Sequence, residues 1–200
     1  MGRKRQHDDA TREALLDAAE AIAEENGASA VSVRGVADAI GTSTRAVYSL
    51  FGSKDGLLSA LAQRVFELLR DEIARVPTSN DPARDLVNAA VRVFRPIAID
   101  HPSLFALGFL RAAPDLQFDA ATRAAAREGL MLLRERVARL ADAGLLDPRD
   151  VDMATMQFNA LCQGLAATEL RNPELLGRSP ERGWRNAFET LIRGLRPAPS

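Results

Sequence analysis

Residues 31–58 read VSVRGVADAIGTSTRAVYSLFGSKDGLL, and this stretch decides the fold of the first part of the chain. Its first half carries apolar residues at the i, i+3, i+4, i+7 spacing of one helix face, namely Val33, Val36, Ala37 and Ile40. Gly41 follows at once, and glycine in that place lets a chain leave a helix through a left-handed conformation. Thr42 and Ser43 then offer hydroxyl groups that can cap a new helix. The pattern predicts two short helices joined by a tight turn.

The second of these helices is expected over residues 43–51. Its predicted inward residues are Thr44, Val47 and Phe51, and its predicted outward residues are Arg45, Ala46, Tyr48 and Ser49. Two short helices joined by a three- or four-residue turn with a glycine form a helix-turn-helix unit, whose second helix typically enters the DNA major groove. The stretch therefore predicts a surface that reads DNA.

The same stretch resembles the N-terminal domain of the tetracycline-repressor (TetR) family of bacterial transcriptional regulators. The matching residues are Val36-Ala37, Gly41, Val47-Tyr48, Phe51 and the segment 53–58. The chain departs from the family at Arg45-Ala46, where many members have Gly-Thr, and at Leu50, where an aromatic residue or histidine is common. Those positions face the groove in the family, so the departures concern the operator sequence and not the fold.

The resemblance implies an all-α protein with two domains. Residues 1–54 would form a three-helix DNA-binding head, and a long fourth helix would join it to a helical ligand-binding and dimerisation bundle over residues 55–200. Arg45 and Ser49 would contact base edges, and Ala46 a thymine methyl group. The other expected DNA contacts, mainly to phosphates, are Arg34, Thr42, Ser43, Thr44, Tyr48 and Lys54.

Charge alone does not suggest a DNA-binding protein. The chain has a net charge of −1, and residues 1–58 hold 7 Lys and Arg against 9 Asp and Glu. Lys54 is nevertheless unusual, because the dipole of the helix that Ser53 would cap disfavours a cation at its first turn by roughly 0.3–1 kcal/mol. A DNA phosphate against that helix start would explain the lysine. An exposed lysine of no consequence is the alternative.

Residues 1–9 are expected to form a disordered basic arm, which is either a solvated tail or an arm that touches the minor groove or phosphates. The first helix is expected over residues 10–26 and the fourth from Lys54 to about Arg75. Beyond the turn-forming linker 76–82, helices are expected over residues 83–100, 102–112, 118–143, 148–171 and 180–195, with a kink or break at Pro96.

The second domain should hold a small, mainly hydrophobic effector, as the resemblance implies, although core packing accounts for most of its apolar residues. The expected lining residues are Phe66, Phe94, Phe105, Phe109, Met131, Phe158 and Cys162. The last two helices carry apolar stripes that favour a two-fold dimer, and burial of both stripes within one chain is the alternative. The expected dimer residues are Phe158, Leu161, Leu165, Trp184, Phe188, Leu191 and Ile192.

The sequence offers little that could support catalysis. His7 and His101 are the two histidines, and Asp100-His101-Pro102 is typical of a helix break. The single cysteine, Cys162, excludes an internal disulfide and fits a reducing cytoplasm. No phosphate loop, metal-ligand spacing or apolar run approaching ~20 residues is present. We therefore expect a cytoplasmic protein with no catalytic residues, no metal, no cofactor and no membrane span.

Together these features predict a homodimeric, ligand-responsive transcriptional regulator, most simply a repressor that an effector releases from a palindromic operator. The alternative is a helical ligand- or protein-binding module that does not bind DNA.

Overall fold

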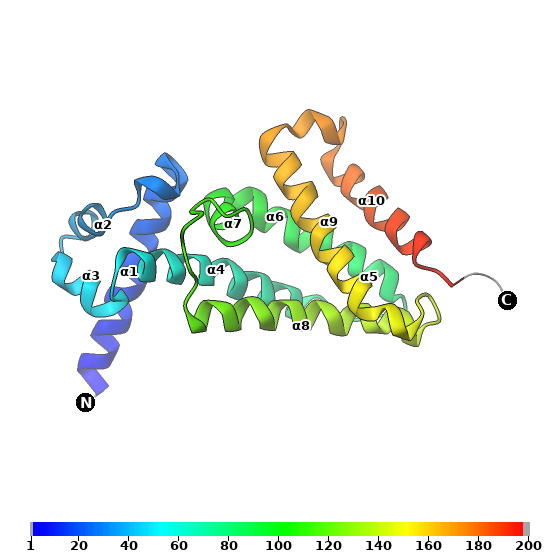
Figure 1. The fold of residues 1–200 in the computed structure, drawn as a ribbon, viewed down its shortest axis with the longest axis horizontal. Coiled ribbons are helices and arrows are strands. Elements are labelled where there is room, and N and C mark those ends of the chain that lie inside the picture. The colour runs from blue at the N-terminus through cyan, green and yellow to red at the C-terminus, as the bar shows by residue number, and fades with distance from the viewer. Residues whose placement is uncertain (1, 198–200) are drawn as a thin grey trace. The chain divides into compact units, whose positions relative to one another are not determined.

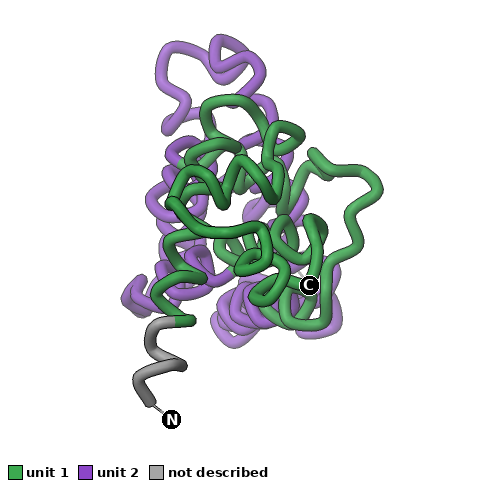
Figure 2. The backbone as a smooth tube through the Cα atoms, turned by 90° about the vertical axis from the view of Figure 1, so that its left-hand side faces the viewer, with its two compact units in different colours: residues 1–66, 101–125 green, residues 67–100, 126–200 purple. Residues whose placement is uncertain are grey.

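A computed structural model describes residues 2–197, with the side chains of residues 8–197, and every regular element in this range is helical (Figure 1). The predicted all-α class is confirmed. The chain divides into two compact units, one of residues 1–66 and 101–125 and the other of residues 67–100 and 126–200 (Figure 2). This division by compactness differs from the boundary expected after residue 54, which stays a prediction about functional domains.

The first unit is built on α1 (Gly2–Asn26), the short η1 (Ala28–Ala30), α2 (Val33–Ala39), α3 (Thr44–Phe51), the first half of α4 (Lys54–Arg75) and α7 (Pro102–Phe109). Its core consists of apolar side chains from the predicted stripes, including Leu15, Ala19, Val36, Val47, Leu57 and Leu61. The helix-turn-helix predicted from residues 31–58 is therefore confirmed as a fold.

Helix α1 begins earlier than expected. The prediction of a disordered arm is wrong for residues 2–9, which continue the helix, while Met1 lies outside the described residues. The segment after Gly2 contains neither glycine nor proline, and its Lys, Arg and Gln residues favour a helix. Once the packed part of α1 has formed, adding these residues fixes one hydrogen bond per residue and needs no new nucleus.

The second unit contains the end of α4, α5 (Pro82–Ala89), η2 (Ala90–Phe94), α6 (Arg95–Asp100), most of α8 (Ala120–Asp142), η3 (Pro148–Asp150), α9 (Val151–Arg171), η4 (Pro173–Leu176) and α10 (Pro180–Gly194). Phe158, Trp184 and Phe188 form the aromatic centre of its core, with ring centroids 5.7–6.1 Å apart. Glu169 accepts hydrogen bonds from Arg95 and from the Trp184 indole in the same region.

The break expected at Pro96 takes the form of a π-helical segment. Residues 90–94 make wider turns, and the backbone N–H of Arg95 donates to the carbonyl oxygen of Ala90, five residues back. Proline has no N–H to donate and its ring crowds the preceding turn, so the chain relieves the conflict by widening that turn. The helix is thus modified before Pro96, and α6 continues through it to Asp100.

Within the described residues, none of the helices combines the length and the apolar character that crossing a membrane would require.

Candidate nucleic-acid interface

The turn between α2 and α3 is fixed by backbone hydrogen bonds and by one glycine. Gly41 has a φ of 67°, the left-handed region that favours glycine. Its N–H donates to the carbonyl of Asp38 at 3.2 Å, and the N–H of Thr42 donates to the carbonyl of Ala37 at 2.9 Å. These two bonds form a Schellman motif, which satisfies the last carbonyls of α2. Any other residue at position 41 would strain the turn.

Serine hydroxyls cap the helices on both sides of this turn. Ser32 accepts from the N–H of Gly35 at 3.1 Å, and Ser43 accepts from the N–H of Ala46 at 3.3 Å. Ser53 does the same for α4, accepting from the N–H of Gly56 at 2.9 Å. The predicted caps at Ser43 and Ser53 are confirmed. Each of these hydroxyls keeps its own proton, which can donate to an external acceptor such as a phosphate oxygen.

Helix α3 is anchored by its inner face and exposes a polar outer face. Val47 is fully buried beneath it, and the Phe51 ring lies under the guanidinium of Arg12, 5.5 Å from its Cζ atom. The exposed residues of α3 are Thr44, Arg45, Tyr48 and Ser49, while Ala46 and Leu50 are half-buried. Tyr48 is 54% exposed, unusual for a large ring that has no partner among the described residues.

One expectation about α3 is wrong. Thr44 is exposed and does not point inward, because Ser43 caps the helix and Thr44 occupies its first position, outside the apolar stripe. The exposure suits the separate prediction that Thr44 lies against DNA. Thr42 is half-buried in the turn, and the exposed Arg34 lies 3.7 Å from Asp38, a surface pair of little energetic weight.

Lys54 starts α4 on the surface, as predicted. It is exposed and forms no ion pair among the described residues, beside the free N–H groups of the helix start. The side chain of Arg45 is likewise exposed and unpaired within the described part of the chain. Two unneutralised cations and several hydroxyl groups therefore lie on α3 and at the beginning of α4. This is a composition that can bind a phosphate backbone.

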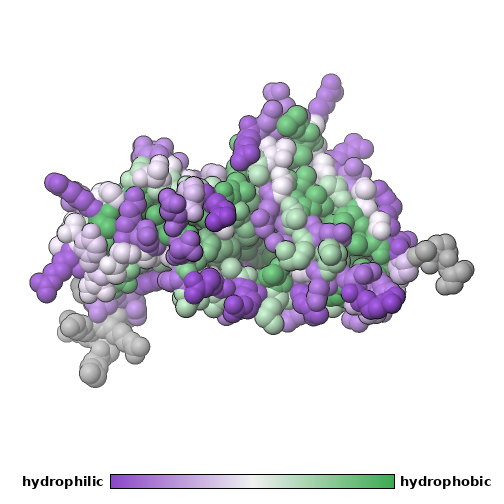
Figure 3. All heavy atoms as spheres, in the orientation of Figure 1, coloured by the Kyte–Doolittle hydropathy of each residue, from purple (hydrophilic) through white to green (hydrophobic). Residues whose placement is uncertain are grey.

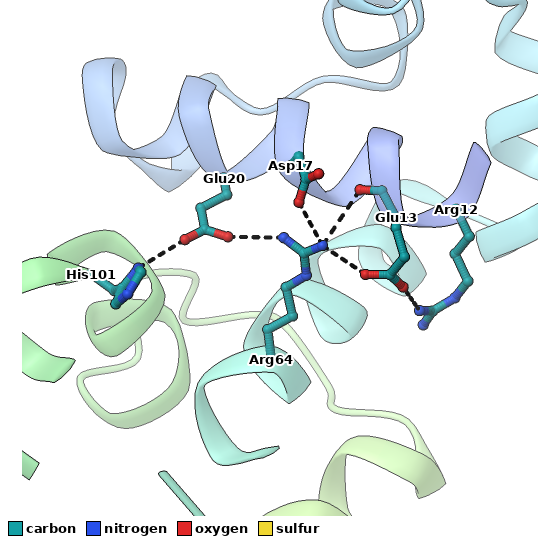
Figure 4. A network of polar contacts seen from close by, with 6 residues as sticks. All are labelled: Arg12, Glu13, Asp17, Glu20, Arg64 and His101. Carbon is teal, nitrogen blue, oxygen red and sulfur yellow. Dashed lines mark hydrogen bonds and ion pairs between the residues drawn. The ribbon is translucent and has the colours of Figure 1, made fainter. Parts of the chain in front are cut away.

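Three acidic residues of α1 pair with an arginine of α4. Glu13, Asp17 and Glu20 all reach the guanidinium of Arg64 on α4, at 2.8, 2.7 and 2.9 Å (Figure 4). Burial would lower the pKa of Arg64, but the hydrogen bonds with Glu13, Asp17 and Glu20 outweigh it and raise that pKa. The sequence shows that α1 is acidic, but it does not show which residues pair with its carboxylates. Arg64 neutralises part of them, and sequence reasoning missed it.

Helix α7 joins the same network. The Nδ1 atom of His101 lies 2.9 Å from a carboxylate oxygen of Glu20 (Figure 4). Ser103 forms two hydrogen bonds with α1: its N–H donates to Glu24, and its hydroxyl donates to the carbonyl of Ala23. His101 precedes Pro102 at the start of α7, so the predicted helix break is confirmed. Its ring is engaged by a carboxylate of the first helix.

The predicted effector residues fall into two aromatic clusters, one in each unit. In the first unit, the ring centroid of Phe109 lies 5.1 Å from that of Phe66 and 5.0 Å from that of Phe105. Phe94 lies 6.3 Å from Trp184, and Phe158 lies 5.7 Å from Phe188. Cys162 is buried and Met131 is 55% exposed. Met131 is thus more exposed than the apolar pattern of the sequence predicts, and its assignment to the effector site stays a prediction.

Four of the predicted dimer residues also need correction. Phe158, Trp184, Phe188 and Ile192 are buried inside the single chain, where α9 packs on α10, so they have almost no surface left for a second copy. Leu161, Leu165 and Leu191 remain half-buried. The exposed face of α9 instead carries Met153, Met156, Ala160 and Gly164, and apolar surface is visible over α9 and α10 in Figure 3.

No group of three or more His, Cys, Asp or Glu side chains among the described residues could hold a metal ion. Burial raises the pKa of the Cys162 thiol well above its ordinary value, so the nucleophilic thiolate is disfavoured.

Comparison with known families assigns both halves of the chain. A family model described as "Bacterial regulatory proteins, tetR family" matches residues 15–61, and one described as "Tetracyclin repressor-like, C-terminal domain" matches residues 87–195. The first match contains the whole helix-turn-helix. The second covers more than half of the chain. No curated protein sequence matches the chain.

Solved structures with similar folds cover nearly the whole chain. A protein of unknown function from Rhodococcus sp. RHA1 is 26% identical, with a TM-score of 0.77 over 93% of this chain and 95% of its own. SmeT in complex with triclosan is 25% identical, with a TM-score of 0.72 over 92% and 91%. The TetR family transcriptional regulator PfmR from Thermus thermophilus is 22% identical, with a TM-score of 0.66 over 92% and 99%, and shows the fold alone.

Proposed function

The chain belongs to the tetR family of bacterial regulatory proteins, and we propose that it acts as a homodimeric, ligand-responsive repressor that binds a palindromic DNA operator. The observation that carries the proposal is the outer face of α3. It presents unpaired polar side chains on a helix whose position is fixed by a buried valine, two serine caps and a glycine turn. Such a helix can enter a major groove without reorganising.

The residues of this face divide into two roles. Arg45 and Ser49 are exposed on α3 and can reach base edges, where an arginine most often reads guanine. Ser43 and Lys54 lie at helix starts, and Tyr48 lies exposed in the middle of α3. They offer hydroxyl or ammonium donors to phosphates, which position the protein without specifying sequence. Thr42 and Arg34 would extend the phosphate contacts on either side.

The proposed dimer uses the exposed face of α9. Two methionines, Met153 and Met156, lie there in line with Ala160 and Gly164, so the helix offers both large and small residues to a partner. A second copy related by a two-fold axis would cover this face and place two α3 helices on one duplex. Half-sites in the usual geometry lie roughly 34–36 Å apart.

Gly164→Arg tests the dimer. A Cβ atom added at this exposed position meets no atom within 4 Å in the single chain, so the fold should survive the substitution, whereas an arginine there should prevent a second copy from packing closely. Sedimentation should then show monomers, while Glu135→Arg on the exposed surface of α8 should leave the dimer intact. A wild-type protein that sediments as a monomer would remove the dimer from the proposal.

Effector response is the remaining part of the proposal. The likeness to SmeT, whose solved structure is a complex with triclosan, supports a small-molecule ligand. The aromatic clusters around Phe109 and Trp184 supply apolar lining material, so a mainly hydrophobic effector is proposed. An effector can release the operator only through its different affinities for two conformations, and such coupling usually changes DNA affinity by about 5–150-fold.

DNA binding is tested by selecting genomic fragments on the purified protein and measuring their affinity by fluorescence anisotropy at several salt concentrations. The expected result is a two-fold symmetric site whose affinity falls steeply with salt. Repeating the selection with candidate effectors should identify the compound class that releases the fragments. Binding that shows no sequence preference and no salt dependence would favour the alternative, a helical ligand- or protein-binding module.

A further inference from the structure

The second compact unit contains a cavity that is open to solvent and has a volume of about 500 Å³, and none of the predicted DNA or effector residues lines it. It lies where the end of α4 and the loop after it meet α5 and η2. Arg75, Arg84 and Arg92 form its basic lining, and Val76, Pro77 and Val93 form its apolar lining. Cavities of this size hold small organic molecules.

The basic lining is organised on one helical face. Arg84, Asn88 and Arg92 follow one another at four-residue intervals along α5 and η2, a spacing that places side chains on the same side of a helix. Arg92 and its neighbour Val93 both lie in the π-helical segment, and both line the cavity. A charged and an apolar side chain of the widened turn thus line the same cavity, and π-helical turns are frequent at functional sites.

The carboxylates of the lining are already occupied. Glu72 is paired with Arg75. Asp85 accepts from the N–H and the hydroxyl of Ser79, both at 2.7 Å, and from Arg139 at 2.8 Å. In contrast, the guanidinium groups of Arg84 and Arg92 form no hydrogen bond or ion pair with any described residue. The charge that remains free around the cavity is therefore positive.

A further guanidinium stands behind the apolar wall. Arg136 is buried, and its Nη2 atom donates to the carbonyls of Ile73 at 2.5 Å and Val76 at 2.8 Å, whereas its Nε and Nη1 atoms have no partner among the described residues. Its charge offsets the negative end of the α4 dipole, which would otherwise repel an anion from this corner. The positive potential behind Val76 adds to that of the two free arginines.

We propose that this cavity binds an amphiphilic carboxylic acid, whose carboxylate is held by Arg84 and Arg92 and whose apolar part lies against Val76, Pro77 and Val93. Arginine offers paired N–H groups that match the two oxygens of a carboxylate. A bare anion would leave the apolar wall in contact with water, and a neutral apolar molecule would leave the two guanidinium groups unused. The inference goes beyond the proposed function, since it requires neither DNA binding nor the predicted effector residues.

The test uses the full-length protein and isothermal titration with octanoate as the probe, with 1-octanol and inorganic phosphate as comparison ligands. Octanoate should bind once per chain, at least about tenfold more tightly than either comparison ligand. R84Q/R92Q should weaken octanoate binding by about tenfold or more. The matched control R178Q/R182Q removes the same charge from arginines elsewhere in the unit and should change the affinity by less than about twofold.

A second readout keeps the proposal testable if a variant folds poorly. In the wild-type protein, octanoate should shift the Nε–Hε resonances of Arg84 and Arg92 and leave those of Arg178 and Arg182 in place. Absence of octanoate binding at about 10 mM, equal weakening in both double variants, or phosphate binding as tight as octanoate binding would each overturn the proposal. A wild-type protein that binds no DNA would refute the proposed function, but it would leave the conclusion on octanoate binding unaffected.

Discussion

Replacing Glu169 by glutamine should destabilise the second unit strongly, although the substitution keeps the size of the side chain. Glu169 is 7% exposed on α9. Its carboxylate accepts from the Nε and Nη2 atoms of Arg95 at 2.6–3.1 Å and from the indole N–H of Trp184 at 2.8 Å. It therefore links α6, α9 and α10 through charged hydrogen bonds that a neutral amide cannot all replace.

The magnitude follows from what glutamine leaves behind. Its carbonyl oxygen can accept from one of the two partners, but its NH₂ group then faces a donor, and the charge of Arg95 loses its counter-ion. Breaking a buried ion pair from one side costs about 3–5 kcal/mol. The side chain of Arg95 is 23% exposed, so water can replace part of the lost interaction, and we expect about 2–4 kcal/mol. For a chain of this length that corresponds to a fall in Tm of roughly 5–15 °C.

Urea unfolding followed by circular dichroism, at one fixed protein concentration, measures the difference between wild type and E169Q. Asp152→Asn is the matched control, because it neutralises an ion pair of similar length with Arg134 whose side chains are 81% and 53% exposed. The control should cost no more than about 1 kcal/mol. If E169Q were within about 0.5 kcal/mol of the wild type, or no less stable than D152N, the network would not stabilise the fold as argued.

The remaining predictions concern DNA binding, packing and pH. Lys54→Ala should weaken DNA binding similarly for all sequences and reduce the salt slope by about one per subunit, as measured by anisotropy. Arg45→Ala should instead relax preference at one operator position by about 1–3 kcal/mol, and an unchanged selection profile would remove Arg45 from the base contacts. Trp184→Ala should lower the free energy of unfolding by about 3–5 kcal/mol, because the ring is fully buried. Burial alone would raise the pKa of Asp85, but hydrogen bonds from Ser79 and Arg139 leave it below the ordinary value. Ionised Asp85 therefore stabilises the fold above about pH 4, and this stabilisation is lost as the pH falls through the lowered pKa. In Asp85→Asn, the free energy of unfolding measured with urea should consequently fall less between neutral and acidic pH than in the wild type.

The helix-turn-helix could be predicted from sequence because its signals are local. Gly41 has the left-handed backbone that a helix end requires, Val47 lies at the centre of the apolar face, and Ser53 caps α4. Each depends on neighbours within four residues. The error at Thr44 has the same local origin, since a shift of one position between cap and first helical residue moves a side chain from the inner to the outer face.

The dimer residues could not be assigned in this way. The apolar stripes of α9 and α10 show which side chains are buried away from water. They do not show whether the same chain or a second copy buries them. In the structure Phe158 and Phe188 stack on each other, so the two predicted stripes cover one another. The exposed line of Met153, Met156 and Gly164 contains small and flexible residues that a hydrophobicity pattern does not single out.

The Arg84, Asn88 and Arg92 spacing is visible in the sequence but has no meaning until the end of α4 is placed opposite it. The same is true of Arg64. Its three carboxylate partners lie 44 to 51 positions earlier in the chain, and only the fold makes them neighbours. Long-range polar contacts of this kind leave no periodic trace, because one residue on each side is enough to form them.

The Arg64 network bears directly on how α3 can move. Arg64 belongs to α4, its three carboxylate partners belong to α1, and Glu20 also holds His101 at the start of α7. A rotation of α4 must either carry α1 with it or break three ion pairs around a side chain that is only 21% exposed. Arg12 of α1 also lies over the Phe51 ring of α3, 5.5 Å from its centroid, so α3 is linked to the same helix. We therefore expect a displaced α4 to shift α1 and α3 together, which would change the position of the proposed DNA-binding face of α3 while leaving its exposed residues intact.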